Sequence, residues 1–191
     1  MCKPILLVAL LYVLSASALS DVCPLGQRSA GPRPTPLSQI QNLSGRQFDS
    51  AYMRAMYQHH SDTSALASLE LQYSNDTSLK ELADKIQHER SDLNAKLAQW
   101  YRASFGGSLS ESCLPPPTVL MSFRGLASAK FDNEFVRLMI DYIQQAKDAA
   151  QLALVKAVSV DLRQQSKIVV RSADLEIAAL RRWQNNLPMF D

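Results

Sequence analysis

The chain has 191 residues, of which 47% are hydrophobic and 20% charged, a composition typical of one globular domain rather than of a disordered or fibrous chain. The formal net charge is only +2, which argues against nucleic acid or an anionic membrane surface as a partner. Aromatic residues make up 7% and there are six glycines, too few for a β-sandwich or barrel.

The first twenty residues have the organisation of a signal peptide. Lys3 gives a short basic start, residues 5–14 form an uncharged apolar run, and small residues follow at 15–20. The run is too short to span about 30 Å of hydrocarbon as a helix, whereas the small residues suit a signal peptidase. We therefore expect export to the periplasm or the cell exterior, with removal of residues 1–20 and no membrane span in the mature chain.

Export determines how the cysteines are interpreted. Cys2 leaves with the signal peptide, so the mature chain keeps Cys23 and Cys113, an even number in an oxidising compartment. We expect one disulfide that ties the N-terminal arm to the mid-chain loop. Two free thiols are the alternative for this pair, and a lipid anchor at Cys23 is the alternative to cleavage within residues 15–20.

Proline, glycine and serine dominate residues 21–43, which predicts an extended, poorly ordered arm. Helical patterns begin directly after it. A capping-box sequence at Ser44–Gln47 opens a helix that is expected to run to about Tyr73. A second capping box at Ser78–Glu81 opens the next helix, whose apolar residues recur at three- and four-residue spacing.

The second half of the chain repeats this pattern. A shift of 83 residues places Phe48 on Phe131 and Trp100 on Trp183 without a gap. Helices are expected over residues 131–158 and 161–185, with the turn and cap at 159–161. We interpret the two halves as copies of one helical hairpin.

Each hairpin has a turn too short for anything but antiparallel packing. Repeat one is assigned to 46–103, repeat two to 128–187, and the connecting loop to 104–127. The sequence therefore predicts an all-α protein in which residues 44–191 form an up-down four-helix bundle.

Polar side chains interrupt the apolar seams of these helices. His59 and His60 lie on or beside the bundle-facing side of the first helix, which also carries Glu70, and Arg90 and Glu176 occupy seam positions on the second and fourth. Because buried charges need partners, we expect histidine, glutamate and arginine to form one satisfied polar layer. The remaining histidine, His88, has no counterpart in the second half and is expected to be solvated.

The residues around the paired histidines resemble the signature of the domain-of-unknown-function family number 305. The resemblance spans roughly residues 46–185, because the second half is similar again at Phe131-Asp132, Met139-Ile140, Glu176-Ile177 and Trp183. In the first half it lies in Phe48-Asp49-x-x-Tyr52-Met53-x-x-Met56-Tyr57-x-His59-His60 and the following Leu66-Ala67.

This resemblance implies a ferritin-like, exported bundle in a family whose members in some cases bind copper through paired histidines and nearby methionines. Carried to this chain, the implied metal ligands are Met56, His59 and His60. The second copy has Tyr142 and Ile143 where the histidine pair is expected. At most one half-site is therefore predicted.

Imidazole suits copper and zinc, and thioether sulfur favours reduced copper. The alternative is that both histidines are satisfied interior or boundary residues and that the methionines fill the core. Catalysis is not expected, because no Glu-x-x-His motif of a di-iron centre occurs in the sequence. Two hypotheses remain: an exported, non-catalytic protein that binds copper or another transition metal, and a metal-free bundle that acts as an envelope interaction or structural module.

Overall fold

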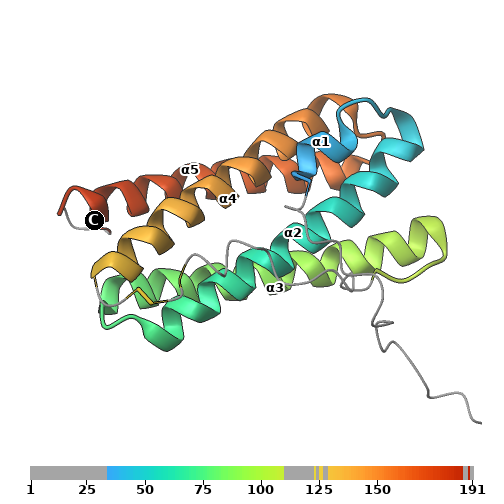
Figure 1. The fold of residues 1–191 in the computed structure, drawn as a ribbon. Helices are drawn as coiled ribbons and strands as arrows, with labels where there is room; N and C mark the ends of the chain where they lie inside the picture. The colour runs from blue at the N-terminus through green and yellow to red at the C-terminus, as the bar shows by residue number, and fades with distance from the viewer. Residues whose placement is uncertain (1–33, 110–122, 124, 127–128, 187–188, 190–191) are drawn as a thin grey trace, which may run out of the picture.

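The computed structural model describes residues 34–109, 123, 125–126, 129–186 and 189, and every structural statement below concerns these residues. The predicted signal peptide, Cys23 and Cys113 lie outside them. The described residues form five helices and no strand (Figure 1): α1 (Pro36–Ile40), α2 (Gly45–Tyr73), α3 (Thr77–Phe105), α4 (Ala129–Lys156) and α5 (Val160–Gln184). The predicted all-α fold class is confirmed.

The helix ends follow from local capping, with two corrections to the sequence prediction. Ser44 precedes α2 as expected, but its side chain makes no capping hydrogen bond. Asp76, rather than Ser78, caps α3, because its carboxylate accepts a hydrogen bond from the Leu79 N–H at 2.9 Å. Carboxylates are among the strongest N-caps, so α3 begins earlier than the predicted capping box. Ser159 caps α5 as predicted.

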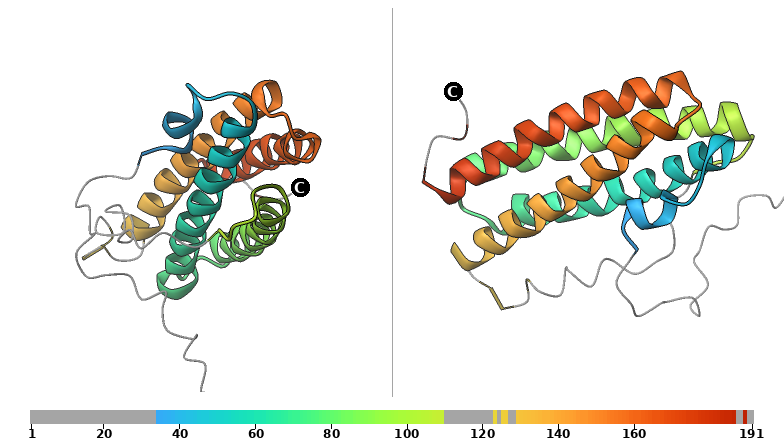
Figure 2. Two further views of the ribbon diagram at one scale, coloured as in Figure 1. Left: turned by 90° about the vertical axis from the view of Figure 1, so that its right-hand side faces the viewer. Right: turned by 90° about the horizontal axis from the view of Figure 1, so that it is seen from above.

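The two hairpins, α2–α3 and α4–α5, lie side by side and pack mainly through α2 and α4 (Figures 1 and 2). The Asp49 carboxylate near the start of α2 accepts hydrogen bonds from the Val158 and Ser159 N–H groups of the α4–α5 turn, at 3.0 and 2.8 Å. At the other end, the Trp183 indole of α5 donates to Asp76 at the start of α3. Thus α2 runs antiparallel to α4, and α3 runs antiparallel to α5.

This arrangement differs in one respect from the predicted alternation of helix directions. Each hairpin is antiparallel as expected, but α3 and α4 run in the same direction, so the chain passes from one end of the bundle to the other between them. About twenty connecting residues reach roughly 65 Å when extended, more than the roughly 43 Å of a 29-residue helix such as α3. A single long crossover is the connectivity of ferritin-like bundles.

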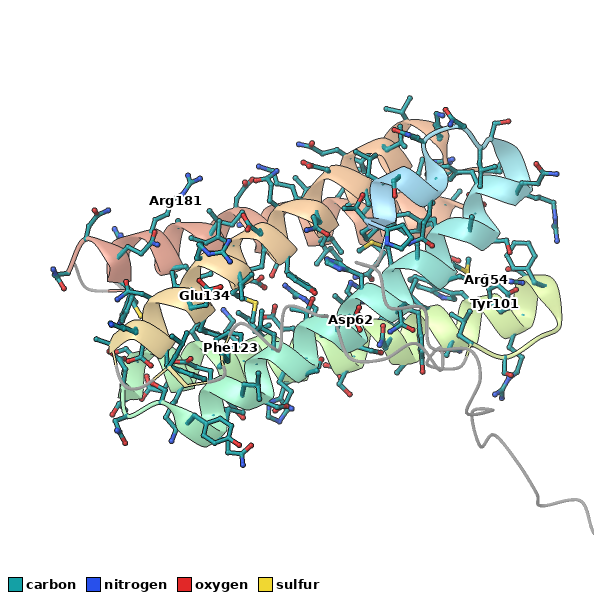
Figure 3. All side chains as sticks on the ribbon, viewed as in Figure 1. Arg54, Asp62, Tyr101, Phe123, Glu134 and Arg181 are labelled. Carbon is teal, nitrogen blue, oxygen red and sulfur yellow. The ribbon has the colours of Figure 1, made fainter. Side chains whose placement is uncertain are left out.

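The hydrophobic core consists of two clusters at opposite ends of the bundle. The first contains the phenylalanines of α4 with Leu66, Ile86 and Ile177. The second contains Phe48 and Met56 of α2 with Leu97 of α3 and the alanines of α4. The small side chains of these alanines allow α4 to pack closely against α2. Both ends also carry aromatic contacts across a hairpin or loop, such as Arg54 with Tyr101 and Phe123 with Phe131 (Figure 3).

The arm is the clearest departure from the sequence prediction. Residues 36–40 form the short helix α1, which packs against α2 and α4 and buries Ile40 completely. Thr35 caps it, and Lys156 of α4 donates to the carbonyl oxygens of Gln41 and Leu43. Proline is compatible with the first turn of a helix, so the composition that predicted an extended arm also permits this short helix.

Replacement of Ile40 by alanine is therefore expected to lower the free energy of unfolding by about 2 kcal/mol, the lower end of the range for a buried isoleucine, because α1 lies at the edge of the core. Urea denaturation followed by circular dichroism measures the change. The matched control is Gln41→Ala at an exposed position of the same segment. Equal, small effects of both substitutions would show that the arm does not stabilise the bundle.

Among the described helices, none is long and apolar enough to cross a membrane.

Candidate metal site

A polar layer separates the two core clusters at the middle of the bundle. On α2 it lies between Met56 and Leu66, and on α3 between Ile86 and Leu97. Its buried members are three residues of α2, one of α3 and one of α5: His59, His60, Thr63, Arg90 and Glu176. Bundle proteins build ligand and metal sites from side chains on facing helices at such positions, so this layer is the candidate functional site.

His59 is directed toward α4. Its Nε2 lies 2.9 Å from the backbone oxygen of Tyr142, and its ring stacks on the Tyr142 ring with a centroid separation of 5.2 Å. A carbonyl oxygen only accepts, so Nε2 carries the proton and Nδ1 keeps the lone pair. Burial lowers the pKa of His59 to about 4, and the Arg90 charge adds to this shift while the Tyr142 hydrogen bond opposes it. The imidazole is neutral at pH 7.

His60 is directed toward α3. Its Nδ1 lies 3.1 Å from Asn94 Oδ1, and the Asn94 amide nitrogen donates to Tyr57 O and Ser61 Oγ, also at 3.1 Å. Because the amide nitrogen is already assigned, Nδ1 of His60 donates to the amide oxygen. Its Nε2 then holds a lone pair that is buried and has no hydrogen-bond partner among the described residues. Burial, Arg90 and His59 together keep the pKa of His60 well below its ordinary value.

The three predicted ligands are all buried, but they do not converge in this packing. Met56 lies one turn before both histidines and packs into the second core cluster, while the two rings bond to different neighbouring helices. Within the described part of the chain, no group of three His, Cys, Asp or Glu side chains is placed to hold a metal ion. The donors present, two neutral imidazoles of fixed tautomer and one thioether, fit a soft ion such as Cu(I).

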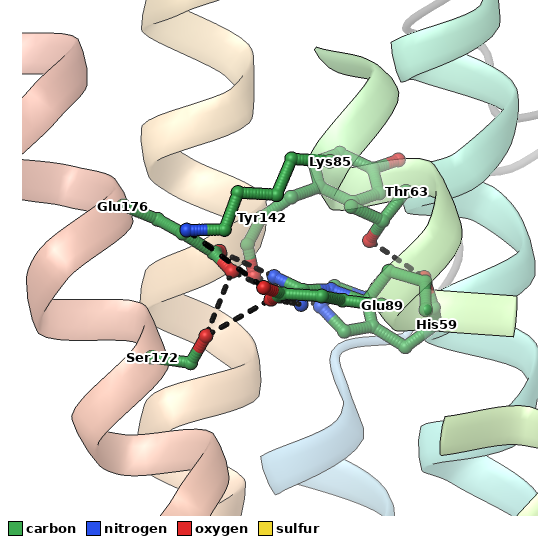
Figure 4. A network of polar contacts seen from close by, with 8 residues as sticks. His59, Thr63, Lys85, Glu89, Tyr142, Ser172 and Glu176 are labelled. Atoms are coloured by element: carbon green, nitrogen blue, oxygen red, sulfur yellow. Dashed lines mark hydrogen bonds and ion pairs between the residues drawn. The ribbon is translucent and has the colours of Figure 1, made fainter. Parts of the chain in front are cut away.

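Arg90 and Glu176, two members of the expected polar layer, form an ion pair with each other. The two guanidinium nitrogens of Arg90 lie 3.2 and 2.5 Å from the two carboxylate oxygens of Glu176, and both side chains are almost fully buried. Ser172 Oγ lies within hydrogen-bond distance of Glu176 and of Glu89, which also pairs with Lys85 at the edge of the layer (Figure 4). This network bridges α3 and α5.

Glu70 is not part of this layer, contrary to the prediction. It lies eleven residues beyond His59, about 16 Å further along α2, and is fully buried with no hydrogen-bond partner for either carboxylate oxygen in the described structure. Burial raises its pKa to about 8; the nearby Ser74 hydroxyl, which does not reach hydrogen-bonding geometry with the carboxylate, and the Lys80 charge oppose the shift, whereas the Asp132 and Asp76 carboxylates add to it. The periodicity that placed Glu70 on a buried stripe was correct, but it does not specify the level along the helix axis.

Two partners of the histidines were missed from the sequence. Asn94 fixes the tautomer of His60, and the backbone oxygen of Tyr142 fixes that of His59. Asn94 follows Arg90 by one turn, so its spacing on the same helix face was an available signal. His88 is exposed and bonds to the Asp84 carbonyl of its own helix, so the prediction that it is solvated is confirmed.

The fold and the layer together define an all-α four-helix bundle with a buried, histidine-containing centre. Residues 26–103 match the model of DUF305, a domain of unknown function. The predicted resemblance is therefore confirmed for the first hairpin. That the second hairpin is a further copy stays a prediction.

Solved structures of low sequence identity share the fold. The Cu(I)-bound form of CopM has a TM-score of 0.64 at 24% identity, covering 72% of this chain and 96% of CopM. Its apo form has a TM-score of 0.63 at 23% identity, with the same coverage. A DUF305 protein from Streptomyces coelicolor has a TM-score of 0.63 at 13% identity, covering 75% of this chain and 97% of that protein. No curated protein matches the sequence.

Proposed function

We propose that this protein is an exported, non-catalytic bundle protein that binds copper in its reduced state through Met56, His59 and His60. The observation that carries the proposal is the buried, unpartnered Nε2 of His60. A buried polar atom without a partner costs about 1–3 kcal/mol. Coordination of a metal ion would satisfy this atom.

The histidine protonation states support metal binding at neutral pH. A metal ligand must be deprotonated, and the pKa of His59, about 4, keeps its ring neutral throughout the physiological range. Each ring nitrogen opposite the expected donor atom is held by a hydrogen bond, to Tyr142 O or Asn94 Oδ1. Partners of this kind fix the tautomer and orientation of metal-binding histidines.

Two further observations support copper and export. CopM, which shares the fold, has been solved with Cu(I), Cu(II) and silver bound. The N-terminal sequence has the organisation of a signal peptide, and the Streptomyces coelicolor protein of the same fold is described as a candidate secreted protein. A periplasmic or extracellular copper-binding protein is the function that combines them.

A competition titration with a chromogenic Cu(I) chelator tests the proposal. The mature protein is expected to withdraw Cu(I) from the chelator, and a His59→Ala/His60→Ala variant is expected to lose this ability, with at least a hundredfold weaker affinity from two lost ligands. His88→Ala is the matched control, since His88 is an exposed histidine on a neighbouring helix. Circular dichroism verifies that all three proteins are folded. Negligible binding by the parent protein, or equal binding by the double variant, would overturn the proposal.

A metal-free interaction module is the second candidate, and one observation favours it. Val155, Val158 and Val160, which are 84%, 55% and 68% exposed, lie together around the α4–α5 turn, and Ile168 and Leu175 are exposed further along α5. Clustered exposed apolar side chains are typical of interaction surfaces. Negligible copper binding by the parent protein, together with concentration-dependent association, would favour this candidate.

A further inference from the structure

Three valines around the α4–α5 turn expose apolar side chains at one end of the bundle. Val155 is 84% exposed, Val158 55% and Val160 68%. The turn itself is bound to the start of α2, because the Asp49 carboxylate accepts hydrogen bonds from the Val158 and Ser159 N–H groups. The backbone of the turn is therefore held in place, while its valines remain open to solvent.

Basic side chains lie at the same end of the bundle as these valines. Figure 2 shows the start of α2 and the end of α3 beside the α4–α5 turn, and Arg46 of α2 donates to a backbone oxygen near the end of α3 at 2.8 Å. Lys156 and Arg163 donate to backbone carbonyl oxygens of this end, and Arg102 is exposed in the last turn of α3. Among the described residues, no carboxylate pairs with any of these four side chains. Their charges are therefore available to an anionic partner.

The net charge of +2 averages over two unlike ends of the bundle. The valine end comprises the described residues 34–49, 99–109 and 154–164. It contains four basic and two acidic residues, and one of the acidic residues, Asp49, is buried. The opposite end, with six acidic and four basic residues, comprises residues 70–84, 129–136 and 178–186. Positive charge and exposed valines therefore coincide at one end of the molecule.

A lipid surface fits the valine end better than a second protein does. A stable protein interface buries about 800 Å² on each partner, far more than three valine side chains provide. Peripheral binding to a bilayer needs only a few apolar side chains that enter the headgroup region, together with basic residues that are attracted to anionic lipids. The valine end supplies both.

We propose that the valine end binds peripherally to an anionic phospholipid surface, with Val155, Val158 and Val160 in the headgroup region and the four basic side chains near the lipid phosphates. Export, as proposed above, brings the protein to the outer face of a membrane. The inference does not depend on copper binding, because the second core cluster separates the valine end from the polar layer with its histidines.

Co-sedimentation of the mature protein with large unilamellar vesicles tests the proposal. Vesicles of phosphatidylcholine mixed with phosphatidylglycerol are expected to bind the protein more tightly than vesicles of phosphatidylcholine alone, and added salt is expected to release it. A Val155→Ser/Val158→Ser/Val160→Ser variant should bind at least tenfold more weakly, since complete burial of one valine side chain is worth about tenfold. Arg102→Gln should weaken binding to the anionic vesicles about fivefold, the contribution of one basic residue near such a surface, and leave binding to the neutral vesicles unchanged.

The matched control is Ile168→Ser/Leu175→Ser, which removes two apolar side chains that are 52% and 63% exposed on α5, about 12 Å or more beyond Val160 along the helix. This variant should keep the parent affinity for both kinds of vesicle. Absence of binding to the anionic vesicles, equal binding to both kinds, or equal losses in the valine and control variants would overturn the proposal. A dimer that dissociates on replacement of the valines, measured by sedimentation velocity without vesicles, would assign this end to a contact between copies of the chain and overturn it as well. If circular dichroism shows that the valine variant is unfolded, Arg102→Gln decides the question by its ratio of anionic to neutral vesicle binding.

Discussion

Replacement of Arg90 by methionine alone is expected to lower the free energy of unfolding by about 3–5 kcal/mol, because Glu176 is left as an uncompensated buried charge. Glu176 is 3% exposed and accepts two hydrogen bonds from the guanidinium. The hydroxyl of Ser172 and the carboxylate of Glu89 cannot replace these donors, since the first has a single proton and the second only accepts. Urea denaturation monitored by circular dichroism measures the loss.

The double substitution Arg90→Met/Glu176→Leu separates the charge from the packing. Replacement of a whole buried ion pair by apolar side chains of similar size is often neutral or stabilising. The double variant is therefore expected to be at least about 2 kcal/mol more stable than Arg90→Met. If both variants are equally unstable, the ion pair does not hold α3 and α5 together electrostatically, and the loss of stability comes from packing.

Replacement of Glu70 by glutamine is expected to stabilise the protein by about 1–3 kcal/mol above pH 8. Both carboxylate oxygens of Glu70 are buried without hydrogen-bond partners in the described structure, so the ionised form is unfavourable in the folded state. Burial raises its pKa from 4.5 to about 8. The amide has similar volume and no charge, so it avoids the cost of ionising the buried carboxyl group.

The pH dependence of this effect has a definite sign. Between pH 4.5 and 8 the folded protein holds a proton on Glu70 that the unfolded chain has lost, so stability falls as the pH rises through this window. The gain from Glu70→Gln should therefore grow over the same window and be small at pH 4. His59, whose folded pKa is about 4, lowers stability as the pH falls below 6.5, but equally in both proteins.

Melting temperatures of the two proteins between pH 4 and 9 measure the effect. The exposed Glu81 provides the control, and Glu81→Gln should shift the melting temperature little at any pH. A stability difference for Glu70→Gln that is constant across the range would show that Glu70 does not change protonation with the pH in the folded state.

The local elements of this fold follow directly from the sequence. Apolar spacing determined four long helices and their buried faces, because a face that recurs every 3.6 residues is buried most effectively by helix packing. Turns of a few residues at 74–76 and 157–159 made each hairpin antiparallel. The sequence could not predict the direction of the second hairpin relative to the first. A long connection between hairpins permits either a return to the same end of the bundle or a crossover to the opposite end.

The capping residues also show which features the sequence predicts and which features packing decides. The turn and cap were expected within residues 159–161, and Ser159 is the N-cap of α5. Asp76 and Ser78 are both good caps by type, and the packing of the hairpin turn selected Asp76. For α1, burial of Ile40 against α2 and α4 outweighed a composition that by itself favours an extended chain.

The sequence identified the residues of the candidate site. The tertiary structure decided which groups each of these residues contacts. Periodicity placed His59, His60, Arg90 and Glu176 on inward faces, and all four are buried. Only the packing of α3 and α4 against α2 decided that the two rings bond to different helices and that His60 keeps an unpartnered nitrogen. The physical reason is that a helical repeat specifies which side of a helix faces the core. The axial level at which that side meets its neighbours depends on the docking of all the helices together.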